Sequence, residues 1–337
     1  MDLGVLLGDP RLPYAYGADG RIGEDELEGV RQLKAALASL SGFTITYLDE
    51  HDRLLDALRA RPPRLALNLC DNGYRNRLRQ ELHVPALLEM FDIPYTGADP
   101  VCMSLCTDKA LIRAIAASQG IPVPEETFVD LRAERWPLPG RYPSLIKPNA
   151  TDGSLGIDPD CVVHDEEEAR AYLRRLADTL ERPQALIQEF LTGDEYTVGI
   201  IGNPESGLTV LPPLVIDYSG LDASLPPILP YASKADPASP YWHAPRFQPA
   251  ALDEATHAQL VDHGTRLFTR LGCRDYARID FRAGADGVPR LLDANYNPTW
   301  NYNGKMAVMA GYAGYSYADL LAMIVEAAMA RYGMHYR

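Results

Sequence analysis

The chain has 337 residues, of which 47% are hydrophobic, and a formal net charge of −14. This length predicts two or three subdomains rather than one simple core. The negative charge argues against a nucleic-acid partner, because phosphate backbones are bound by clustered Lys and Arg. No apolar run reaches the roughly 18 residues of a membrane span, and the start lacks the basic residues of a signal peptide. We therefore expect a cytoplasmic protein with no membrane partner.

The five cysteines are scattered along the chain. No pair has the C-x-x-C spacing typical of a zinc site, and the odd count does not suggest a disulfide framework. Each is expected to be a buried free thiol.

The N-terminal part alternates between strand and helix patterns. Strands are expected at 5–7, 43–47 and 65–69, and helices at 24–40, 54–58 and 84–90. Strands that alternate with helices predict a parallel sheet covered by helices. Turn residues at 93–97 end this unit.

The middle of the chain predicts a second unit. A helix is expected at 108–119, with Thr107 as its N-cap and Gly120 as its stop. Asp165 and Glu168 resemble a capping box at the start of a second helix. The strands of this unit are expected at 144–147 and 185–190.

The third unit contains more strands and a long connection. Strands are expected at 196–201, 277–281 and 291–294, and helices at 254–271 and 317–332. The proline-rich stretch 211–249 is predicted to be a long, partly mobile loop, because loops of this length are usually functional or disordered.

Several residues suit phosphate binding. Lys109 lies near a helix start, and Lys147 lies at the end of a strand. The loop 152–156 (DGSLG) contains glycines that allow close backbone approach to phosphate oxygens. Phosphoryl transfer from ATP needs such cations and backbone donors together with Mg²⁺.

Oxygen ligands for Mg²⁺ occur in two later strands. Asp280 lies in the segment RIDF, and Asp293 and Asn295 lie in LDAN. The last two are two residues apart on a strand, so both point to one face and can reach the same ion. Each feature is weak alone, but their order along the chain favours an ATP- and Mg²⁺-dependent enzyme.

The chain resembles the D-alanine–D-alanine ligase family of the ATP-grasp superfamily from about Leu65 to the C-terminus. The segments that carry the resemblance are 88–97 (LEMFDIPYTG), 108–109 (DK), 121–124 (IPVP), 146–148 (IKP), 188–190 (QEF), 195–198 (EYTV), 276–280 (YARID) and 292–298 (LDANYNP). The resemblance implies an α/β ATP-grasp fold, in which ATP lies between two antiparallel sheets beside an N-terminal parallel-sheet domain. Its subdomains are expected at 1–98, 99–191 and 192–337.

The resemblance also implies which residues contact ATP. They are Lys109, Lys147, Gly153, Ser154, Gly156, Gln188, Glu189, Leu191, Glu195 and Lys234. The first two would bind the α- and β-phosphates, and the glycine loop would cover them. Residues 188–191 would hold adenine, Glu195 would take the ribose hydroxyls, and Lys234 would reach the γ-phosphate from a mobile loop.

The implied reaction is amide formation through an acyl-phosphate. Asp280, Asp293 and Asn295 would bind two Mg²⁺ ions, with Mn²⁺ as an alternative, and Arg278 would stabilise the oxyanion of the tetrahedral intermediate. Ser154 and Lys234 would also act in catalysis. Small-molecule carboxylate and amine substrates are expected, as is a homodimer.

The chain departs from the family at the substrate end. The family's N-terminal G-G-x-S-x-E segment is replaced by 7–11 (LGDPR), and its His-Gly segment by 68–74 (NLCDNGY). Gly153 stands in place of a family serine and Ala235 in place of a family tyrosine. Asn72 and Arg75 are candidate substrate contacts in the replaced region.

The acceptor end differs as well. The family's Ser-Leu pair aligns with Gly304 and Lys305, and Lys305 could bind a substrate carboxylate or be a solvated surface lysine. Tyr296, Trp300 and Tyr302 either line a pocket for a bulkier substrate or fill space left by smaller neighbours. These departures favour an ATP-dependent carboxylate–amine ligase for amino-acid-like substrates other than two D-alanines. The alternatives are a D-alanine–D-alanine ligase proper, an ATP-grasp phosphotransferase and a nucleotide-binding regulator without turnover.

Overall fold

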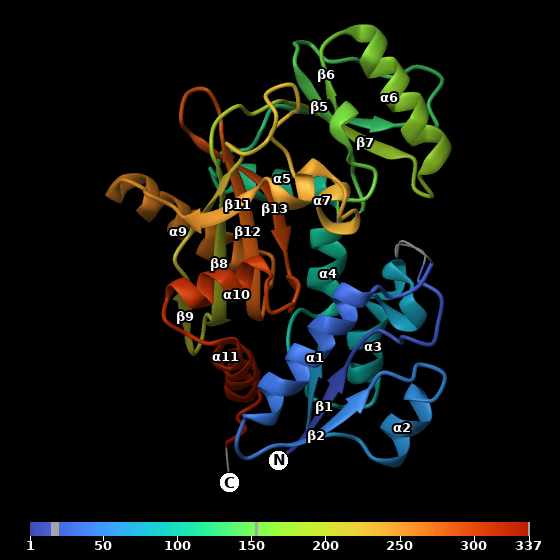
Figure 1. Ribbon diagram of the computed structural model, residues 1–337, viewed down its shortest axis with the longest axis vertical. Coiled ribbons are helices and arrows are strands. Elements are labelled where there is room, and N and C mark those ends of the chain that lie inside the picture. The colour runs from blue at the N-terminus through green and yellow to red at the C-terminus, as the bar shows by residue number, and fades with distance from the viewer. Residues whose placement is uncertain (15–19, 152–153, 336–337) are drawn as a thin grey trace.

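The computed structural model describes residues 1–14, 20–151 and 154–335. Figure 1 shows an elongated molecule with a parallel sheet at one end, a small sheet with one long helix at the other, and a larger sheet between them. The predicted α/β architecture with parallel and antiparallel sheets is confirmed.

The N-terminal sheet is parallel, as the alternating pattern predicted. Its strands are β1 (Asp2–Leu6), β2 (Thr44–Leu48) and β3 (Leu65–Asn68), in the order β2-β1-β3. Its helices are α1 (Glu24–Ala38), α2 (Leu54–Ala60) and α3 (His83–Met90). Apolar side chains of β1 are buried on both faces, because α1 packs on one face and α2 with α3 on the other (Figure 1).

The small sheet is antiparallel. Its strands are β4 (Glu126–Asp130), β7 (Gln184–Glu189), β5 (Ser144–Pro148) and β6 (Val162–Val163), in that order. Helix α6 (Glu166–Thr179) covers it with buried Tyr172 and Leu176. Asp165 caps this helix by accepting from the Glu168 backbone N–H at 2.9 Å, as predicted, whereas the Glu168 side chain accepts from His164.

The larger sheet is also antiparallel. Its strands are β11 (Arg246–Pro249), β10 (Leu214–Asp217), β8 (Glu195–Asn203), β12 (Asp275–Ala283) and β13 (Pro289–Asn295) in that order, with β9 (Gly207–Val210) beside β8. The helices packed on it are α4 (Pro100–Thr107), α5 (Lys109–Ser118) and α9 (Glu254–Arg270). Helices α4 and α5 belong to the expected central subdomain, yet their buried residues pack with the C-terminal strands.

Two C-terminal helices join the larger sheet to the N-terminal sheet. They are α10 (Lys305–Tyr312) and α11 (Tyr317–Arg331), and one apolar core includes both helices, β1, β3 and α1. The fully buried carboxylate of Asp275 adds a polar link, because it accepts from the backbone N–H of Gly97 at 2.8 Å and pairs with Arg331 at 2.8 Å.

Some local expectations were wrong. Thr107 ends α4, and Asp108 caps α5 by accepting from the Leu111 N–H at 3.0 Å. The expected loop 211–249 instead contains β10, β11 and two short helices, α7 (Ala232–Ala235) and α8 (Pro240–His243). Strand β10 pairs with β8, and local sequence patterns do not reveal such distant pairing.

Among the described helices, none is long and apolar enough by itself to cross a membrane. The bent pair α10 and α11, which meet at 104°, meets that criterion only when the two are taken together.

Candidate functional site

The predicted metal ligands lie on paired strands of the larger sheet. Asp280 on β12 is the cross-strand partner of Asp293 on β13, and Arg278 is the partner of Asn295. Residues two apart on a strand share a face, and here the polar groups meet: Asn295 Nδ2 donates to Asp280 Oδ2 at 3.0 Å. The sequence-based expectation that these residues gather on one face therefore agrees with their placement.

Cations surround the Asp280 carboxylate. Arg278 donates to both of its oxygens at 2.9 Å, and the hydroxyl of Thr197 also donates to it. Burial acts to raise the pKa of Asp280, but Arg278, Lys305 and these hydrogen bonds outweigh burial, so the net pKa is lowered. Asp280 is therefore held as a carboxylate, the form that binds a divalent cation.

The same group of residues fits Mg²⁺. Asp280, Asp293 and Asn295 offer carboxylate and amide oxygens, which are the ligands that Mg²⁺ prefers. Asp293 Oδ1 accepts from the Ala294 N–H at 3.0 Å, and its Oδ2 lies 3.8 Å from the ammonium of Lys109. This places a predicted phosphate-binding lysine next to a predicted metal ligand.

Two buried lysines face this carboxylate group. Lys109 is the first residue of α5 and is 5% exposed, and its ammonium donates to the carbonyl of Thr151. Lys147 on β5 is 6% exposed, and its ammonium makes no hydrogen bond or ion pair with any described residue. Burial, followed by repulsion from Arg113, holds the pKa of Lys147 well below its usual range. A buried cation without a partner fits a site that receives an anion.

The sequence interpretation missed Arg113 and Glu126. Arg113 lies one turn after Lys109 on α5 and is 1% exposed; it donates to Glu126 at 2.5 Å, while its Nη2 has no partner. Gln188 donates to the same carboxylate at 2.7 Å. The four-residue spacing from Lys109 places Arg113 on the same helix face. This spacing is the sequence feature from which Arg113 could have been predicted.

Two of the predicted adenine and ribose contacts accept hydrogen bonds from groups of the protein. The Glu189 side chain accepts from Arg141 and from the Glu125 N–H, so it is held by neighbours rather than left free. Glu195 accepts from the Tyr218 hydroxyl at 2.9 Å. Leu191 is buried, and its backbone remains a candidate contact for a base.

The glycine loop and the Lys234 segment meet. Gly153 lies outside the described residues. Ser154 and Gly156 have positive φ angles, and a Cβ on Gly156 would approach Pro148 to 2.7 Å. Lys234 on α7 donates to the Ser154 hydroxyl at 3.1 Å. The segment expected to be mobile is thus docked against the small sheet.

Lys234 is exposed, yet protein atoms crowd its ammonium. Desolvation, followed by repulsion from Arg278 and Lys305, lowers the pKa of Lys234 to about 8. Three cations therefore converge near the predicted metal ligands, and an anionic substrate would relieve their repulsion.

Lys305 lies near the carboxylate of Asp280. It begins α10, and its ammonium lies 5.5 Å from the ring centroid of Phe247. Burial lowers the pKa of Lys305 while the nearby Asp280 charge raises it. Gly304 caps the helix, and a Cβ there would approach Thr299 to 2.9 Å, so packing favours glycine at this position.

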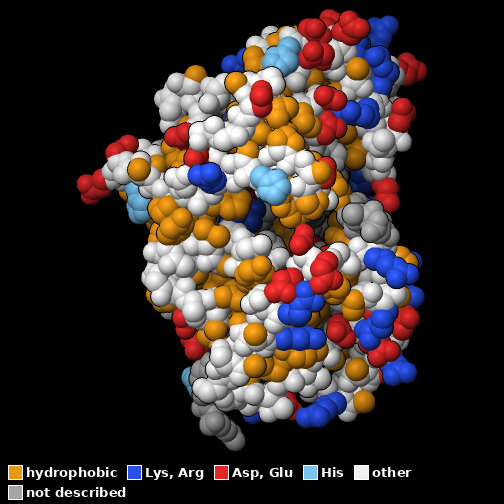
Figure 2. Space-filling view, in the orientation of Figure 1, with side chains coloured by type: hydrophobic (Ala, Val, Ile, Leu, Met, Phe, Trp, Pro, Cys, Tyr) orange, Lys and Arg blue, Asp and Glu red, His pale blue; other side chains and the backbone are white. Residues whose placement is uncertain are grey.

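The other predicted substrate contacts differ in their surroundings. Arg75 pairs with Asp52 on the surface at 3.1 Å, and buried Asn72 donates to Glu26 at 2.7 Å. Tyr302 is 39% exposed. Tyr296 is buried and donates to Glu81, and Trp300 is partly buried. Tyr296 and Trp300 pack with different apolar cores, and Tyr302 is in neither of them. Figure 2 shows a hollow between the N-terminal part and the part of the molecule above it, with acidic and basic side chains along its lower rim.

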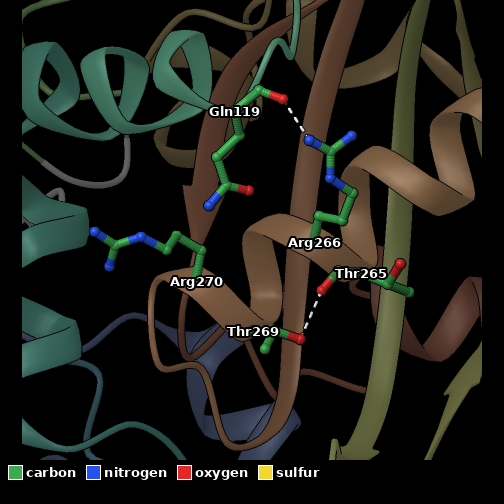
Figure 3. A pocket seen from close by; sticks show the side chains of 5 residues that line it. All are labelled: Gln119, Thr265, Arg266, Thr269 and Arg270. Carbon is green, nitrogen blue, oxygen red and sulfur yellow. Dashed lines mark hydrogen bonds between the residues drawn. The ribbon is translucent and has the colours of Figure 1, made fainter.

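Two further features lie outside this group of residues. A shallow surface pocket of about 540 Å³ lies along α9 and is lined by Arg266, Arg270 and Gln119 (Figure 3). Its lining includes none of the predicted site residues.

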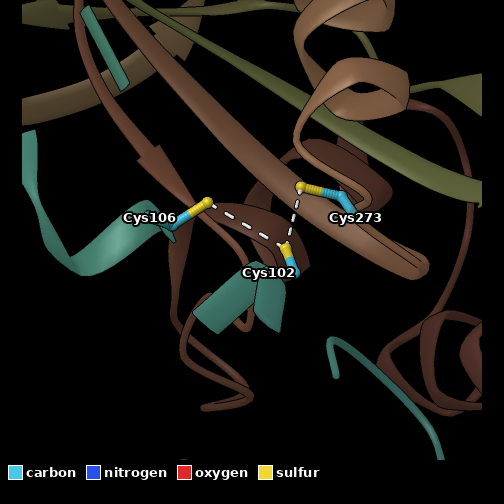
Figure 4. A group of neighbouring side chains, drawn as sticks. All are labelled: Cys102, Cys106 and Cys273. Carbon is cyan, nitrogen blue, oxygen red and sulfur yellow. Dashed lines mark hydrogen bonds between the residues drawn. The ribbon is translucent and has the colours of Figure 1, made fainter. Parts of the chain in front are cut away.

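The second feature is a cluster of three buried thiols. Cys102 Sγ lies 4.0 Å from Cys106 Sγ and 3.8 Å from Cys273 Sγ (Figure 4). These sulfurs are close enough to share a soft metal ion. They do not suit Mg²⁺, which takes oxygen ligands. All five cysteines are buried free thiols, as expected from the sequence.

Comparison with known proteins agrees with this geometry. The family described as "D-ala D-ala ligase C-terminus" matches residues 118–326. The uncharacterized protein y4sG of Sinorhizobium fredii is 30% identical over 250 residues, which cover 74% of this chain and 70% of the relative. A D-alanine–D-alanine ligase of Bordetella petrii is 29% identical over 245 residues, which cover 72% of this chain and 70% of that protein.

Solved structures share the fold. The D-alanine–D-alanine ligase of Bacillus anthracis complexed with ATP matches with a TM-score of 0.72, at 20% identity, over 98% of both chains. The VanG D-Ala:D-Ser ligase of Enterococcus faecalis matches with a TM-score of 0.70, at 16% identity, over 97% of this chain and 99% of that one.

Proposed function

The chain belongs to the D-alanine–D-alanine ligase family, and from this premise we propose that it joins a carboxylate to an amine through an acyl-phosphate, on amino-acid-like substrates other than two D-alanines. The family is one of ATP-dependent, ADP-forming carbon–nitrogen ligases. The observation that carries the proposal is a buried lysine without a hydrogen bond or ion pair to a described residue, Lys147, near a group of oxygen ligands, Asp280, Asp293 and Asn295.

The nucleotide is proposed to lie between the small sheet and the larger sheet. Lys109 and Lys147 would neutralise its phosphates, and Lys234 with Ser154 and the Gly153–Gly156 loop would close over them. Backbone groups of 188–191 would hold the base. Glu195 would bind the ribose after exchanging its hydrogen bond from Tyr218.

Asp280, Asp293 and Asn295 would hold two Mg²⁺ ions. When bound, these ions offset the repulsion between an anionic carboxylate and the triphosphate. Mn²⁺ should substitute, since its ligand preferences are similar. A metal titration of ATP-analogue binding would count the ions, and a stoichiometry of one would contradict the two-ion proposal.

Arg278 is proposed to stabilise the oxyanion. Asp280 engages its Nε and Nη2 and so fixes the guanidinium plane, while Nη1 makes no hydrogen bond to a described residue. A positioned donor of this kind stabilises charge that develops when an amine attacks the acyl-phosphate carbonyl. A kinase would form no such tetrahedral carbon, so Arg278 supports the ligase over a phosphotransferase.

The substrate end supports substrates other than two D-alanines. The carboxylate of Asp9, in the replaced N-terminal segment, is 2% exposed and accepts from Arg11 and from the His51 N–H. The Asp9 carboxylate is therefore engaged in hydrogen bonds within the protein. D-alanine–D-alanine ligation remains the second candidate function, because the Bordetella petrii relative carries that name.

One assay tests these alternatives. Phosphate release would be measured with amino acids and small acids, singly and in pairs, with D-alanine as one member. For an active pair, oxygen-18 in the carboxylate donor should appear in the released phosphate. A stable phosphorylated product would support the phosphotransferase, and activity restricted to paired D-alanine would contradict the proposed substrate class.

The remaining structural proposals are the subdomain boundaries 1–98, 99–191 and 192–337, and a homodimer. Limited proteolysis would test the boundaries. Sedimentation equilibrium would give the subunit number, and a monomer at micromolar concentration would contradict the dimer.

A further inference from the structure

We propose that Cys102, Cys106 and Cys273 form a binding site for one soft metal cation, of which Cu⁺ matches the ligands better than Zn²⁺. The bound ion would connect helix α4 to the turn between α9 and β12. The three sulfur ligands are different residues from the oxygen ligands proposed for Mg²⁺, and the inference does not rest on the proposed ligase function.

Two of the three thiols lie on one face of α4. Cys102 and Cys106 are four residues apart, a spacing that makes side chains neighbours on a helix. Their Sγ atoms lie 4.0 Å apart. The start of α4 is held by Asp99, whose carboxylate accepts from the Cys102 N–H at 2.8 Å. Local structure therefore positions this pair of ligands.

The third thiol lies in a distant turn, whose backbone is also held in place. The N–H of Cys273 donates to the carbonyl of Phe268 in the last turns of α9 at 3.0 Å. Gly272, between the helix and Cys273, has a φ of +73°, the left-handed conformation in which glycine commonly ends a helix. The Sγ of Cys273 lies 3.8 Å from the Sγ of Cys102 (Figure 4). Packing of α4 against this turn therefore completes the group.

The spacing of the sulfurs matches a single metal ion. All three ligand atoms lie within 4.8 Å of one another. A metal–sulfur bond of about 2.3 Å places sulfurs about 4.0 Å apart in a trigonal arrangement and about 3.8 Å apart in a tetrahedral one. The separations of 4.0 and 3.8 Å agree with these values. One ion could therefore contact all three sulfurs with little movement of the backbone.

The two cysteines outside the group have different surroundings. Buried cysteines often pack as small apolar side chains, and Cys161 does so in the core of the small sheet. The Sγ of Cys70 lies 3.7 Å from Nε2 of His51. The three clustered thiols instead direct their sulfurs toward one another, within a core that is otherwise mainly aliphatic (Figure 4). Sulfurs that converge in this way present a complete set of soft ligands.

The number and kind of ligands favour Cu⁺. Thiolates select soft cations such as Cu⁺ and also bind Zn²⁺. Structural Zn²⁺ sites almost always have four protein ligands, and no fourth His, Cys, Asp or Glu among the described residues joins this group. The charged neighbours Asp99 and Arg274 form an ion pair at 3.7 Å, so their charges largely offset each other. The cation itself would therefore balance the charge of the thiolates.

A bound ion would cross-link two parts of the chain that are distant in sequence. Cys106 lies near the end of α4, just before α5, and Cys273 lies just before β12 of the larger sheet. An ion that binds the folded chain more tightly than the unfolded chain raises the free energy of unfolding. Metal binding should therefore be visible as a higher thermal unfolding temperature, without any measurement of turnover.

The test measures metal binding and thermal unfolding of the reduced protein without nucleotide. Cu⁺ would be titrated anaerobically in competition with a chromophoric Cu⁺ chelator, and Zn²⁺ with a chromophoric Zn²⁺ chelator. Because the thiols are buried, the metal content of protein expressed in copper- or zinc-supplemented medium would be measured as well. We expect one ion per chain, thiolate-to-metal charge-transfer absorption, a raised unfolding temperature and tighter binding of Cu⁺ than of Zn²⁺.

Substitution of the ligands identifies the site. Cys106→Ser and Cys273→Ser keep the size of the side chain and remove a soft ligand. Each should weaken Cu⁺ binding more than roughly a hundredfold, because loss of a mere hydrogen-bond partner of a metal ligand already costs about ten- to a hundredfold. Each should also lose the rise in unfolding temperature. Cys161→Ser is the matched control, since it changes a buried thiol in another core, and it should bind Cu⁺ as the wild type does.

The outcomes separate the proposal from its alternatives. Circular dichroism would confirm that each variant is folded, and Cys106→Ala, which buries no hydroxyl, would replace a serine variant that fails to fold. Failure of the folded wild type to bind either cation would overturn the inference, as would equal binding by the wild type and the cluster variants. Tighter binding of Zn²⁺ than of Cu⁺ would contradict the preference for Cu⁺. None of these results depends on whether the chain is a ligase.

Discussion

Two regions of the molecule differ in how they carry charge. On the side proposed to bind the nucleotide (the nucleotide side), Lys109 and Lys147 lie near the carboxylate of Asp293, so opposite charges are close together. On the N-terminal side, Glu26 and Asp71 lie together without a basic partner. The residues of the nucleotide side lie in segments that match the family. Asp71 lies in the segment 68–74, which replaces a family segment.

This difference has a chemical reason. Phosphoryl transfer requires cations and oxygen ligands at fixed positions, which limits how far the nucleotide side can vary. Substrate recognition requires only that pocket walls complement the ligand. A substrate side can therefore change from one enzyme to another while the reaction type stays the same.

The largest expected effect is on the metal ligands. Asp293→Ala should reduce turnover at least a hundredfold with the fold intact, because it removes a charge-stabilising group from the proposed Mg²⁺ site. The measurement is phosphate release across a Mg²⁺ titration. Asp286→Ala is the control, since Asp286 is an exposed carboxylate in the turn between β12 and β13. Near-normal turnover of Asp293→Ala at limiting Mg²⁺ would contradict the metal assignment.

Lys147→Met tests whether the buried cation is held for phosphate. The KM for ATP should rise roughly a hundredfold, the upper end for a lost charge-assisted contact. The apo protein should become no less stable, because a buried unpaired charge gives way to an apolar side chain. Isothermal titration with an ATP analogue and thermal unfolding provide the two readouts.

The pH dependence of unfolding sharpens this prediction. The folded-state pKa of Lys147 is below its unfolded value, so the unfolded chain binds more protons between the two values. This group therefore makes stability rise with pH in that window. The methionine variant should lose that contribution. A marked loss of apo stability in Lys147→Met would show that the ammonium has a structural partner.

Lys305→Ala should raise the KM of one organic substrate about ten- to a hundredfold and leave the KM of ATP nearly unchanged. Lys305→Arg should restore part of the loss, and less if the site needs a compact charge. If both KM values stay constant in Lys305→Ala, Lys305 does not bind a substrate. Substrate recognition would then depend on Arg278 and the N-terminal side.

The smallest expected effect concerns Lys234. Its pKa is lowered to about 8, so its charge is lost as pH rises through that value. The kcat/KM for ATP, which reports free-enzyme ionisations, should fall severalfold above this pH. Lys234→Arg should move that decline to higher pH, because arginine stays charged. An unchanged pH profile of kcat/KM would show that Lys234 does not contribute to phosphate binding.

The amino-acid sequence by itself determined the local features of this protein. Strand alternation put Asp293 and Asn295 on one face, because the two-residue repeat of a strand is a local property. The alternation of strands and helices gave the N-terminal parallel sheet. The ordered motifs indicated the family, since each occupies a short continuous segment.

Only the tertiary structure decided which distant side chains meet. It placed Arg113 against Glu126, docked Lys234 on Ser154, brought Cys273 to Cys102, and turned the expected loop 211–249 into strands of the larger sheet. It also brought Asn72 to Glu26 of α1, so that Glu26 lies near Asp71. These contacts depend on long-range packing and strand pairing, whose stabilising partners lie far apart in the sequence. The periodicity of the sequence and the spacing of its motifs do not reveal which distant residues come into contact.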